Sequence, residues 1–113
     1  MKDDRFYLIH VTECIARVKE YVTPGQEAFM ASNLIQDAVL RNLQTLGESA
    51  RRLSDETKAQ SPEVDWRGII GFRNVMVHNY LGITLDRVWQ VIEKDLPTLE
   101  HQIQLIVEKL DQT

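Results

Sequence analysis

Residues 35–53, IQDAVLRNLQTLGESARRL, carry the clearest periodic pattern of this 113-residue chain. Apolar residues recur there at intervals of four, four, three, four and three, namely Ile35, Val39, Leu43, Leu46, Ala50 and Leu53. At about 3.6 residues per turn, this spacing places them on one face of an α-helix. The pattern therefore predicts a long amphipathic helix over about residues 32–53, with its apolar face in a core.

A helix over about residues 3–22 is predicted before it, on an apolar stripe that consists of Phe6, Ile9, Ile15, Val18 and Val22. Pro24 and Gly25 then interrupt the helical pattern. After the long helix, Ser54 and Asp55 begin a stretch that we expect to be a polar loop reaching Pro62.

The C-terminal half shows helix-start signals. Asp65 is suited to cap a helix that opens at Trp66 and ends between His78 and Gly82. Thr84 is suited to cap the next helix. Pro97 fits the first turn of a last helix, where proline removes no helical hydrogen bond, or it marks a kink in one longer helix.

These patterns predict an all-α fold, a four- to five-helix up-and-down bundle in a single domain over residues 1–113. No segment shows the strict apolar–polar alternation of a half-buried strand. A hydrophobic content of 43% and a charged content of 27% are typical of a globular protein.

The sequence and its composition also bear on the cellular location and on the binding of nucleic acid. No apolar run reaches the roughly 18–20 residues that span a membrane, and the first residues lack the basic and apolar regions of a signal peptide. The single Cys14 has no partner for an internal disulfide, so we expect a buried thiol and a cytoplasmic location. Because the net charge is −4, any binding of nucleic acid must depend on a local positive site.

The stretch FRNVMVHNYLG, residues 72–82, gathers polar side chains that suit phosphate chemistry. In RNA cleavage without a metal, a ribose 2′-hydroxyl attacks the neighbouring phosphorus while a base and an acid move protons. His78 has the right ordinary pKa for this transfer, and the guanidinium of Arg73 matches the oxygens of phosphate. This pair is therefore a candidate catalytic site.

Spacing alone leaves this assignment open, because Arg5 and His10 are also five positions apart but lack the additional polar residues that accompany Arg73 and His78. Positions five apart on a helix differ by about 140°. Arg73 and His78 would share a site if the helix ended before His78, or if a second copy supplied the partner groups. Asn74 lies four positions before His78, on its face. The alternative is a solvated Arg73 and Asn74, with His78 at a helix C-terminus.

The fuller motif resembles the HEPN superfamily, and specifically the HepT toxins that are paired with minimal nucleotidyltransferases. The family signature is Arg, a polar residue, three further positions and His-X-Tyr, which matches Arg73, Asn74, His78 and Tyr80. The flanking sequences WRGIIGFRN and LGITLDRVW are also similar to the family, as are residues 36–54 and KDLPTLEHQI. The resemblance extends over nearly the whole chain.

The resemblance implies a two-fold homodimer in which Arg73 and His78 of both subunits line one cleft. It implies a metal-independent endoribonuclease toxin that leaves 2′,3′-cyclic phosphate and 5′-hydroxyl ends, with no cofactor. The antitoxin would be a small nucleotidyltransferase that transfers AMP from ATP to Tyr80. Such a modification adds negative charge and bulk near Arg73.

The long helix carries further candidates for contact with RNA. Arg41 and Asn42 flank its apolar stripe and are suited to phosphate, although a solvated helix face explains them equally well. Glu48 is suited to pair with an arginine and orient it. Arg51 and Arg52 either widen a basic rim or are ordinary residues of an exposed helix end.

The remaining polar and aromatic residues suggest no other chemistry. Trp66 and Trp89 sit in apolar patterns that favour packing over stacking with bases, and His101 is expected to be structural. No spacing of His, Cys or acids suggests a metal site, and no glycine-rich phosphate loop is present. Two other functions stay open, a non-catalytic module that binds a nucleotide or partner, and a dimeric scaffold.

Overall fold

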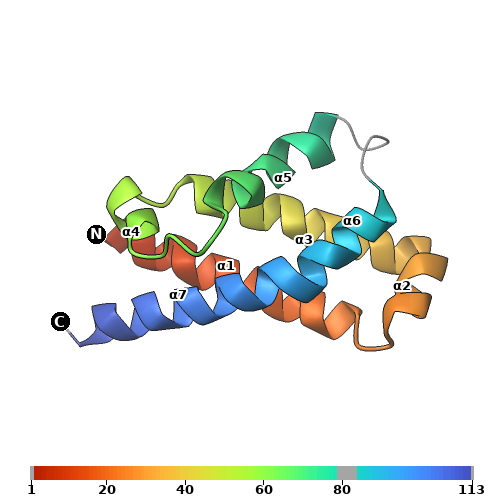
Figure 1. Ribbon diagram of the computed structural model, residues 1–113, viewed down its shortest axis with the longest axis horizontal. Helices are drawn as coiled ribbons and strands as arrows, with labels where there is room; N and C mark the ends of the chain where they lie inside the picture. Colours follow the sequence, from red (N-terminus) through yellow and green to blue (C-terminus); the bar gives the residue numbers. More distant parts are fainter. Residues whose placement is uncertain (1, 79–83, 113) are drawn as a thin grey trace.

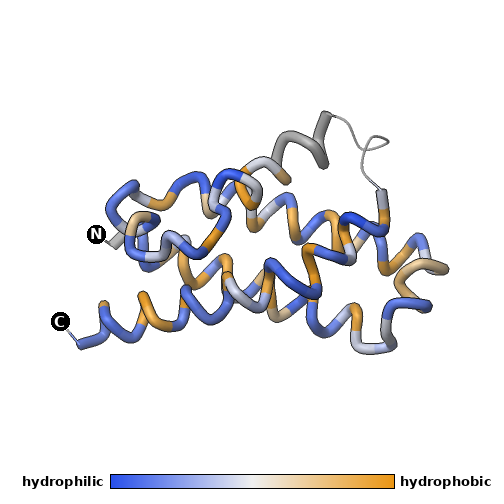
Figure 2. The backbone as a smooth tube through the Cα atoms, in the orientation of Figure 1, coloured by the Kyte–Doolittle hydropathy of each residue, from blue (hydrophilic) through white to orange (hydrophobic). Residues whose placement is uncertain are grey.

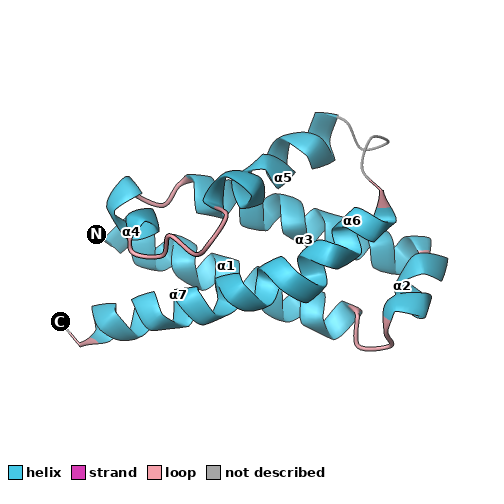
Figure 3. Ribbon diagram, viewed as in Figure 1, coloured by secondary structure: helices cyan, strands magenta, loops and turns pink. Residues whose placement is uncertain are grey.

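The computed structural model describes the backbone of residues 2–78 and 84–112 and the side chains of residues 4–72 and 84–112. Within these ranges the regular structure is entirely helical (Figure 3), which confirms the predicted all-α fold. The elements are α1 (Lys2–Tyr21), α2 (Gln26–Ala31), α3 (Asn33–Arg51), α4 (Asp55–Ala59), α5 (Trp66–His78), α6 (Leu85–Gln90), a π-helical segment (Val91–Asp95) and α7 (Leu96–Asp111).

Four long helical runs form the bundle, namely α1, α3, α5 and the continuous run from α6 to α7 (Figure 1). Helix α3 packs against both α1 and α5, and α7 packs against α1. An ion pair joins the N-terminal end of α1 to the C-terminal end of α7, with 2.6 Å between Nη1 of Arg5 and Oδ1 of Asp111. The described helices thus match the expected bundle, with the short α2 and α4 in addition.

Helix α3 forms as its apolar period predicts. Ser32 caps it, because its hydroxyl oxygen accepts a hydrogen bond from the Ile35 amide at 3.1 Å. The predicted apolar positions from Val39 to Leu53 are buried, and Ile35 packs at the edge of the core. Figure 2 shows hydrophilic and apolar residues recurring along the long helices, as an amphipathic bundle requires.

The buried face of α1 differs from the predicted stripe. Ile15 and Val18 are buried as expected, but Phe6 is 61% exposed and Ile9 is 46% exposed. The core face of α1 instead consists of Leu8, Val11, Cys14, Ile15 and Val18. Cys14 is fully buried as predicted, and this burial raises the pKa of its thiol.

The segment between α3 and α5, which we expected to be a loop, contains α4. Its cap is Ser54, whose hydroxyl oxygen accepts from the Thr57 amide at 3.1 Å. Asp4 of α1 holds this cap in place. Its carboxylate accepts hydrogen bonds from the Ser54 amide at 3.0 Å, the Ser54 hydroxyl at 2.7 Å and the Thr57 hydroxyl at 2.6 Å. The contacts join the start of α1 to residues about 50 positions away.

Replacing Asp4 with asparagine is expected to lower the free energy of unfolding by about 1.5–3 kcal/mol at pH 7. Burial raises the pKa of the Asp4 carboxyl, but hydrogen bonds from Ser54 and Thr57 outweigh it, and the net pKa is lowered. A lowered pKa stabilises the fold at pH values above the unfolded pKa of about 4, and this contribution disappears as the pH falls through the folded pKa.

Urea unfolding of the wild type and of Asp4→Asn at pH 7 and at pH 3 measures this effect. The difference between the two proteins should shrink at the lower pH, whereas Asp86→Asn, which changes an exposed carboxylate, should have little effect at either pH. An Asp4→Asn penalty that is the same at both pH values would contradict the assignment.

The start of α5 is the one predicted. The Asp65 carboxylate accepts a hydrogen bond from the Gly68 amide at 3.1 Å, the geometry of an N-cap. Trp66 is half-buried, and its indole N–H donates to the carbonyl oxygens of Lys58 and Ser61 at 3.0 and 3.1 Å. Trp66 therefore fixes the α4–α5 connection, as expected of a packing residue.

Helices α6 and α7 form one continuous helical run. Thr84 caps α6 as predicted, with its hydroxyl oxygen 3.2 Å from the Arg87 amide. Proline lacks an N–H and its ring collides with the carbonyl four residues earlier in a regular helix. The π-helical segment directly before Pro97 relieves this conflict, since the Leu96 amide donates to the Val91 carbonyl, five residues back.

Trp89 is a core residue, as its apolar pattern predicted. It is 9% exposed, and its ring centroid lies 5.4 Å from that of Phe29 in α2. This contact attaches α2 to the C-terminal run. None of the helices in the described ranges has the length and apolar character needed to cross a membrane.

Candidate functional site

Helix α5 carries the principal motif positions. Arg73, Asn74 and His78 belong to its C-terminal half, and the helix continues without a break to His78. Their side chains, and Tyr80 as a whole, lie outside the described residues. Among the described side chains of α5, Ile69 and Phe72 are buried, with 3% and 8% exposure, and they hold the helix against the core just before the motif.

The continuity of α5 determines how positions 73 and 78 lie relative to each other. At about 100° per residue, positions 73 and 78 differ by about 140° around the helix axis. Positions 74 and 78 are one turn apart, on the same side. Because the helix extends as far as His78, a helix end before this residue does not bring positions 73 and 78 together.

Helix α3 packs against α5 and runs in the opposite direction (Figure 1). Arg41 is exposed on α3. Asn42 is half-buried, and its side-chain amide donates to the Ala38 carbonyl at 2.9 Å, within the same helix. The guanidinium of Arg41 therefore faces solvent, whereas Asn42 is bonded to its own helix.

Glu48 does pair with arginine, as predicted, and its partners are Arg51 and Arg52. One carboxylate oxygen lies 2.9 Å from Nη2 of Arg51 and 3.0 Å from Nε of Arg52. The three residues occupy the C-terminal end of α3, close to α1. Glu48 thus orients two guanidiniums of its own helix.

The two other histidines occupy different environments. His101 is exposed on α7. His10 is half-buried, with Nδ1 3.2 Å from the hydroxyl oxygen of Ser49. This contact links α1 to α3, so His10 has a structural role.

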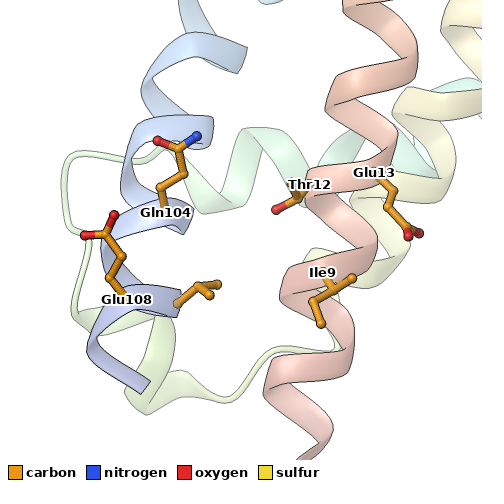
Figure 4. A pocket seen from close by; sticks show the side chains of 6 residues that line it. Ile9, Thr12, Glu13, Gln104 and Glu108 are labelled. Carbon is orange, nitrogen blue, oxygen red and sulfur yellow. The ribbon is translucent and has the colours of Figure 1, made fainter. Parts of the chain in front are cut away.

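A groove between α1 and α7 is a poor site for a phosphate. It encloses about 290 Å³, and its walls consist of Ile9, Thr12, Glu13, Gln104, Val107 and Glu108 (Figure 4). The groove includes no motif position, and its two carboxylates repel anions. Among the residues with described positions, no group of three or more His, Cys, Asp or Glu is arranged to hold a metal ion.

Comparison with known proteins gives a family for this architecture. The ribonuclease HepT-like family model matches residues 11–106, a range that contains α3, α5 and the whole motif. This chain belongs to the HepT-like ribonuclease family. The match confirms the resemblance to the HEPN superfamily that the motif suggested.

Individual relatives agree with the family. The HepT-like chain is 31% identical to "Putative RNase TTE0752" of Caldanaerobacter subterraneus subsp. tengcongensis over 96% of its own length and 98% of the relative. It is 27% identical to "Probable ribonuclease HepT" of Thermococcus cleftensis, over 87% of this chain and 90% of the relative.

A third relative is a longer protein. "Gamma-glutamylcyclotransferase and putative RNase MJ0434" of Methanocaldococcus jannaschii is 33% identical over 97% of this chain, which spans 50% of that relative. No solved structure matches the HepT-like chain significantly.

The sequence reasoning overlooked one group of surface residues. In α1, the Phe6 ring lies against those of Tyr7 and His10, and the guanidinium of Arg52 is 6.0 Å from the centroid of the Tyr7 ring. The apolar pattern of α1 predicts a buried Phe6, and this prediction is wrong. The basic pair Arg51–Arg52 was a weak signal of this surface, but nothing local to either segment indicates that the two helices meet there.

Proposed function

We propose that this chain is a metal-independent endoribonuclease and the toxin of a toxin–antitoxin pair. Arg73 and His78 are the proposed catalytic residues, and Asn74 supports them. The family match that includes the motif carries this proposal. The exposed Arg41 supports it, because an RNA-phosphate contact on α3 would lie on the helix that packs against α5.

The continuous helix α5 supports a catalytic cleft shared by two subunits. Positions 73 and 78 differ by about 140° around the axis of α5, which favours a site that takes the two groups from different chains. In a two-fold dimer, the same surface of each subunit meets its equivalent, and Arg73 of one copy is brought toward His78 of the other. A homodimer is therefore part of the proposed active form.

The proposed reaction is a transesterification. The 2′-oxygen of a ribose bonds to the adjacent phosphorus, the bond from phosphorus to the 5′-oxygen breaks, and the products are a 2′,3′-cyclic phosphate and a 5′-hydroxyl. A base removes the proton from the 2′-hydroxyl and an acid protonates the leaving 5′-oxygen, with His78 taking part in this transfer. The guanidinium of Arg73 stabilises the additional negative charge on phosphorus oxygens in the transition state.

The proposed switch is AMP transfer to Tyr80 by a partner nucleotidyltransferase. The phenolic oxygen of Tyr80 attacks the α-phosphorus of ATP, and pyrophosphate leaves. The attached phosphate is an anion, so it would compete with RNA for Arg73, and the adenosine would occupy space in the cleft. Catalysis itself needs no cofactor in this scheme.

Incubation of the purified protein with total RNA in the presence of EDTA tests the reaction. We expect cleavage at an undiminished rate, with cyclic phosphate at one new end and a hydroxyl at the other. Loss of cleavage in EDTA that added Mg²⁺ restores would contradict the metal-independent mechanism. No cleavage under any of these conditions would instead favour a binding subunit for the nucleotidyltransferase.

A further inference from the structure

An exposed group of aromatic and basic side chains lies where α1 crosses the C-terminal end of α3. We call it the aromatic–basic patch, and it consists of Phe6, Tyr7, His10, Arg51 and Arg52. The Phe6 ring meets Tyr7 edge to face, with 5.1 Å between centroids and 78° between planes. It lies 5.8 Å from the His10 ring at an angle of 35°.

Phe6 does not contribute to the hydrophobic core. It is 61% exposed, and it is not among the residues of the hydrophobic core or those packed against it. Its two aromatic neighbours limit the directions in which its ring can turn. A large apolar ring that is held in place yet left in water provides a flat surface on which another ring can stack.

The basic members of the patch are also held in place. Glu48 bonds to both Arg51 and Arg52, and the guanidinium of Arg52 lies over the Tyr7 ring. Hydrogen bonds to Tyr7 and Glu48 raise the pKa of Arg52 further above neutral pH. The bond to Glu48 uses Nε of Arg52, and a guanidinium has five N–H donors. The two guanidiniums and the carboxylate of Glu48 together carry a net positive charge.

A strip of polar residues on α3 extends from the patch to Arg41. Arg41, Thr45, Glu48 and Arg52 follow one another at intervals of four, three and four, along one side of the helix. The distance from Arg41 to Arg52 is about 16 Å along the helix axis. Helices α3 and α5 run in opposite directions (Figure 1). The strip therefore runs from the patch toward the end of α5 that carries the motif.

We propose that the aromatic–basic patch binds an unpaired stretch of the RNA substrate, with a base stacked on Phe6 and phosphates held by Arg51 and Arg52. An aromatic ring beside guanidiniums is the combination that single-stranded nucleic acids require. Another exposed apolar surface, near Ile9, lines a groove whose walls include Glu13 and Glu108, and these carboxylates repel phosphate. This inference rests on the proposed ribonuclease function and adds a second contact outside the cleft.

The test measures binding of a fluorescent oligouridine of about 12 nucleotides that carries 2′-O-methyl groups and therefore cannot be cleaved. Phe6→Ala should weaken binding at least about fivefold, since stacking on one aromatic ring contributes at least about that factor. Phe6→Trp should bind at least as well as the wild type. Leu34→Ala is the matched control, because Leu34 is an 80% exposed apolar residue on α3 outside the patch.

Two further measurements separate stacking from other contacts. An oligonucleotide without bases should bind the wild type and Phe6→Ala equally, because the sugar–phosphate chain alone cannot stack. For the uridine probe, Arg52→Ala should reduce the slope of log affinity against log salt concentration by about 0.7, the value for one lost phosphate contact on a single strand.

The outcomes distinguish this proposal from the ribonuclease function. If the wild type cleaves total RNA but Phe6→Ala binds the uridine probe as Leu34→Ala does, the patch proposal is wrong and the ribonuclease function stands. If Phe6→Ala changes the mass of the assembly in analytical ultracentrifugation and leaves RNA binding unchanged, the patch is a protein contact and the proposal is again wrong. If the wild type neither cleaves nor binds RNA, both proposals fail.

Discussion

Replacing His78 with alanine is expected to slow RNA cleavage by about 100-fold to 10,000-fold, the range in which a positioned acid or base contributes. The change removes the group that is proposed to move the proton, while Arg73 still neutralises the phosphate. Binding of an uncleavable oligonucleotide should therefore change far less than the cleavage rate. End-labelled RNA under single-turnover conditions measures the rate of the chemical step.

His101→Ala is the matched control, since His101 is an exposed histidine on α7, remote in sequence from the motif. This variant should cleave RNA at the wild-type rate. Helicity and the urea midpoint of His78→Ala should match those of the wild type, because His78 lies at the last position of α5. Cleavage by a folded His78→Ala protein at the wild-type rate would refute the catalytic assignment.

Replacing Tyr80 with phenylalanine is expected to make the ribonuclease resistant to the proposed nucleotidyltransferase antitoxin. With the partner nucleotidyltransferase and ATP, the wild-type protein should gain one or more AMP units and lose nearly all cleavage activity. Tyr80→Phe has no oxygen to accept AMP, so its activity should persist under the same conditions. Mass spectrometry of the intact protein and RNA cleavage in the same samples report the two results together.

Tyr21→Phe is the corresponding control, because Tyr21 is a half-buried tyrosine at the end of α1. This variant should be modified and silenced like the wild type. Silencing of Tyr80→Phe without a gain in mass would mean that the antitoxin acts by binding alone. AMP transfer to another tyrosine would contradict the proposal that Tyr80 is the modified residue.

The sequence predicted those helices whose signals are local. The period of α3 and the caps at Asp65 and Thr84 each depend on residues within a few positions of one another. The prediction was wrong in α1, where Phe6 and Ile9 mark a second apolar stripe next to the true core stripe. Periodicity alone does not tell which of two adjacent stripes faces the core, since that depends on where α3 and α7 pack.

Features that depend on distant residues were not predicted. Helix α4 follows an ordinary Ser54 cap, but the Asp4 carboxylate that holds this cap is 50 positions away in the sequence. The aromatic–basic patch likewise forms only when α1 meets α3. For the proposed catalytic motif, the sequence supplied the residue types, and the structure adds the continuous helix that separates positions 73 and 78 by more than a third of a turn.

A mixed dimer tests the shared cleft most directly. Arg73→Ala and His78→Ala homodimers should each be nearly inactive, because each lacks one kind of group entirely. When the two variants are co-expressed with different tags and the mixed dimer is isolated, its cleft contains one arginine and one histidine from different subunits. We predict that this dimer cleaves RNA much faster than either parent. A mixed dimer as inactive as both parents would contradict the shared cleft.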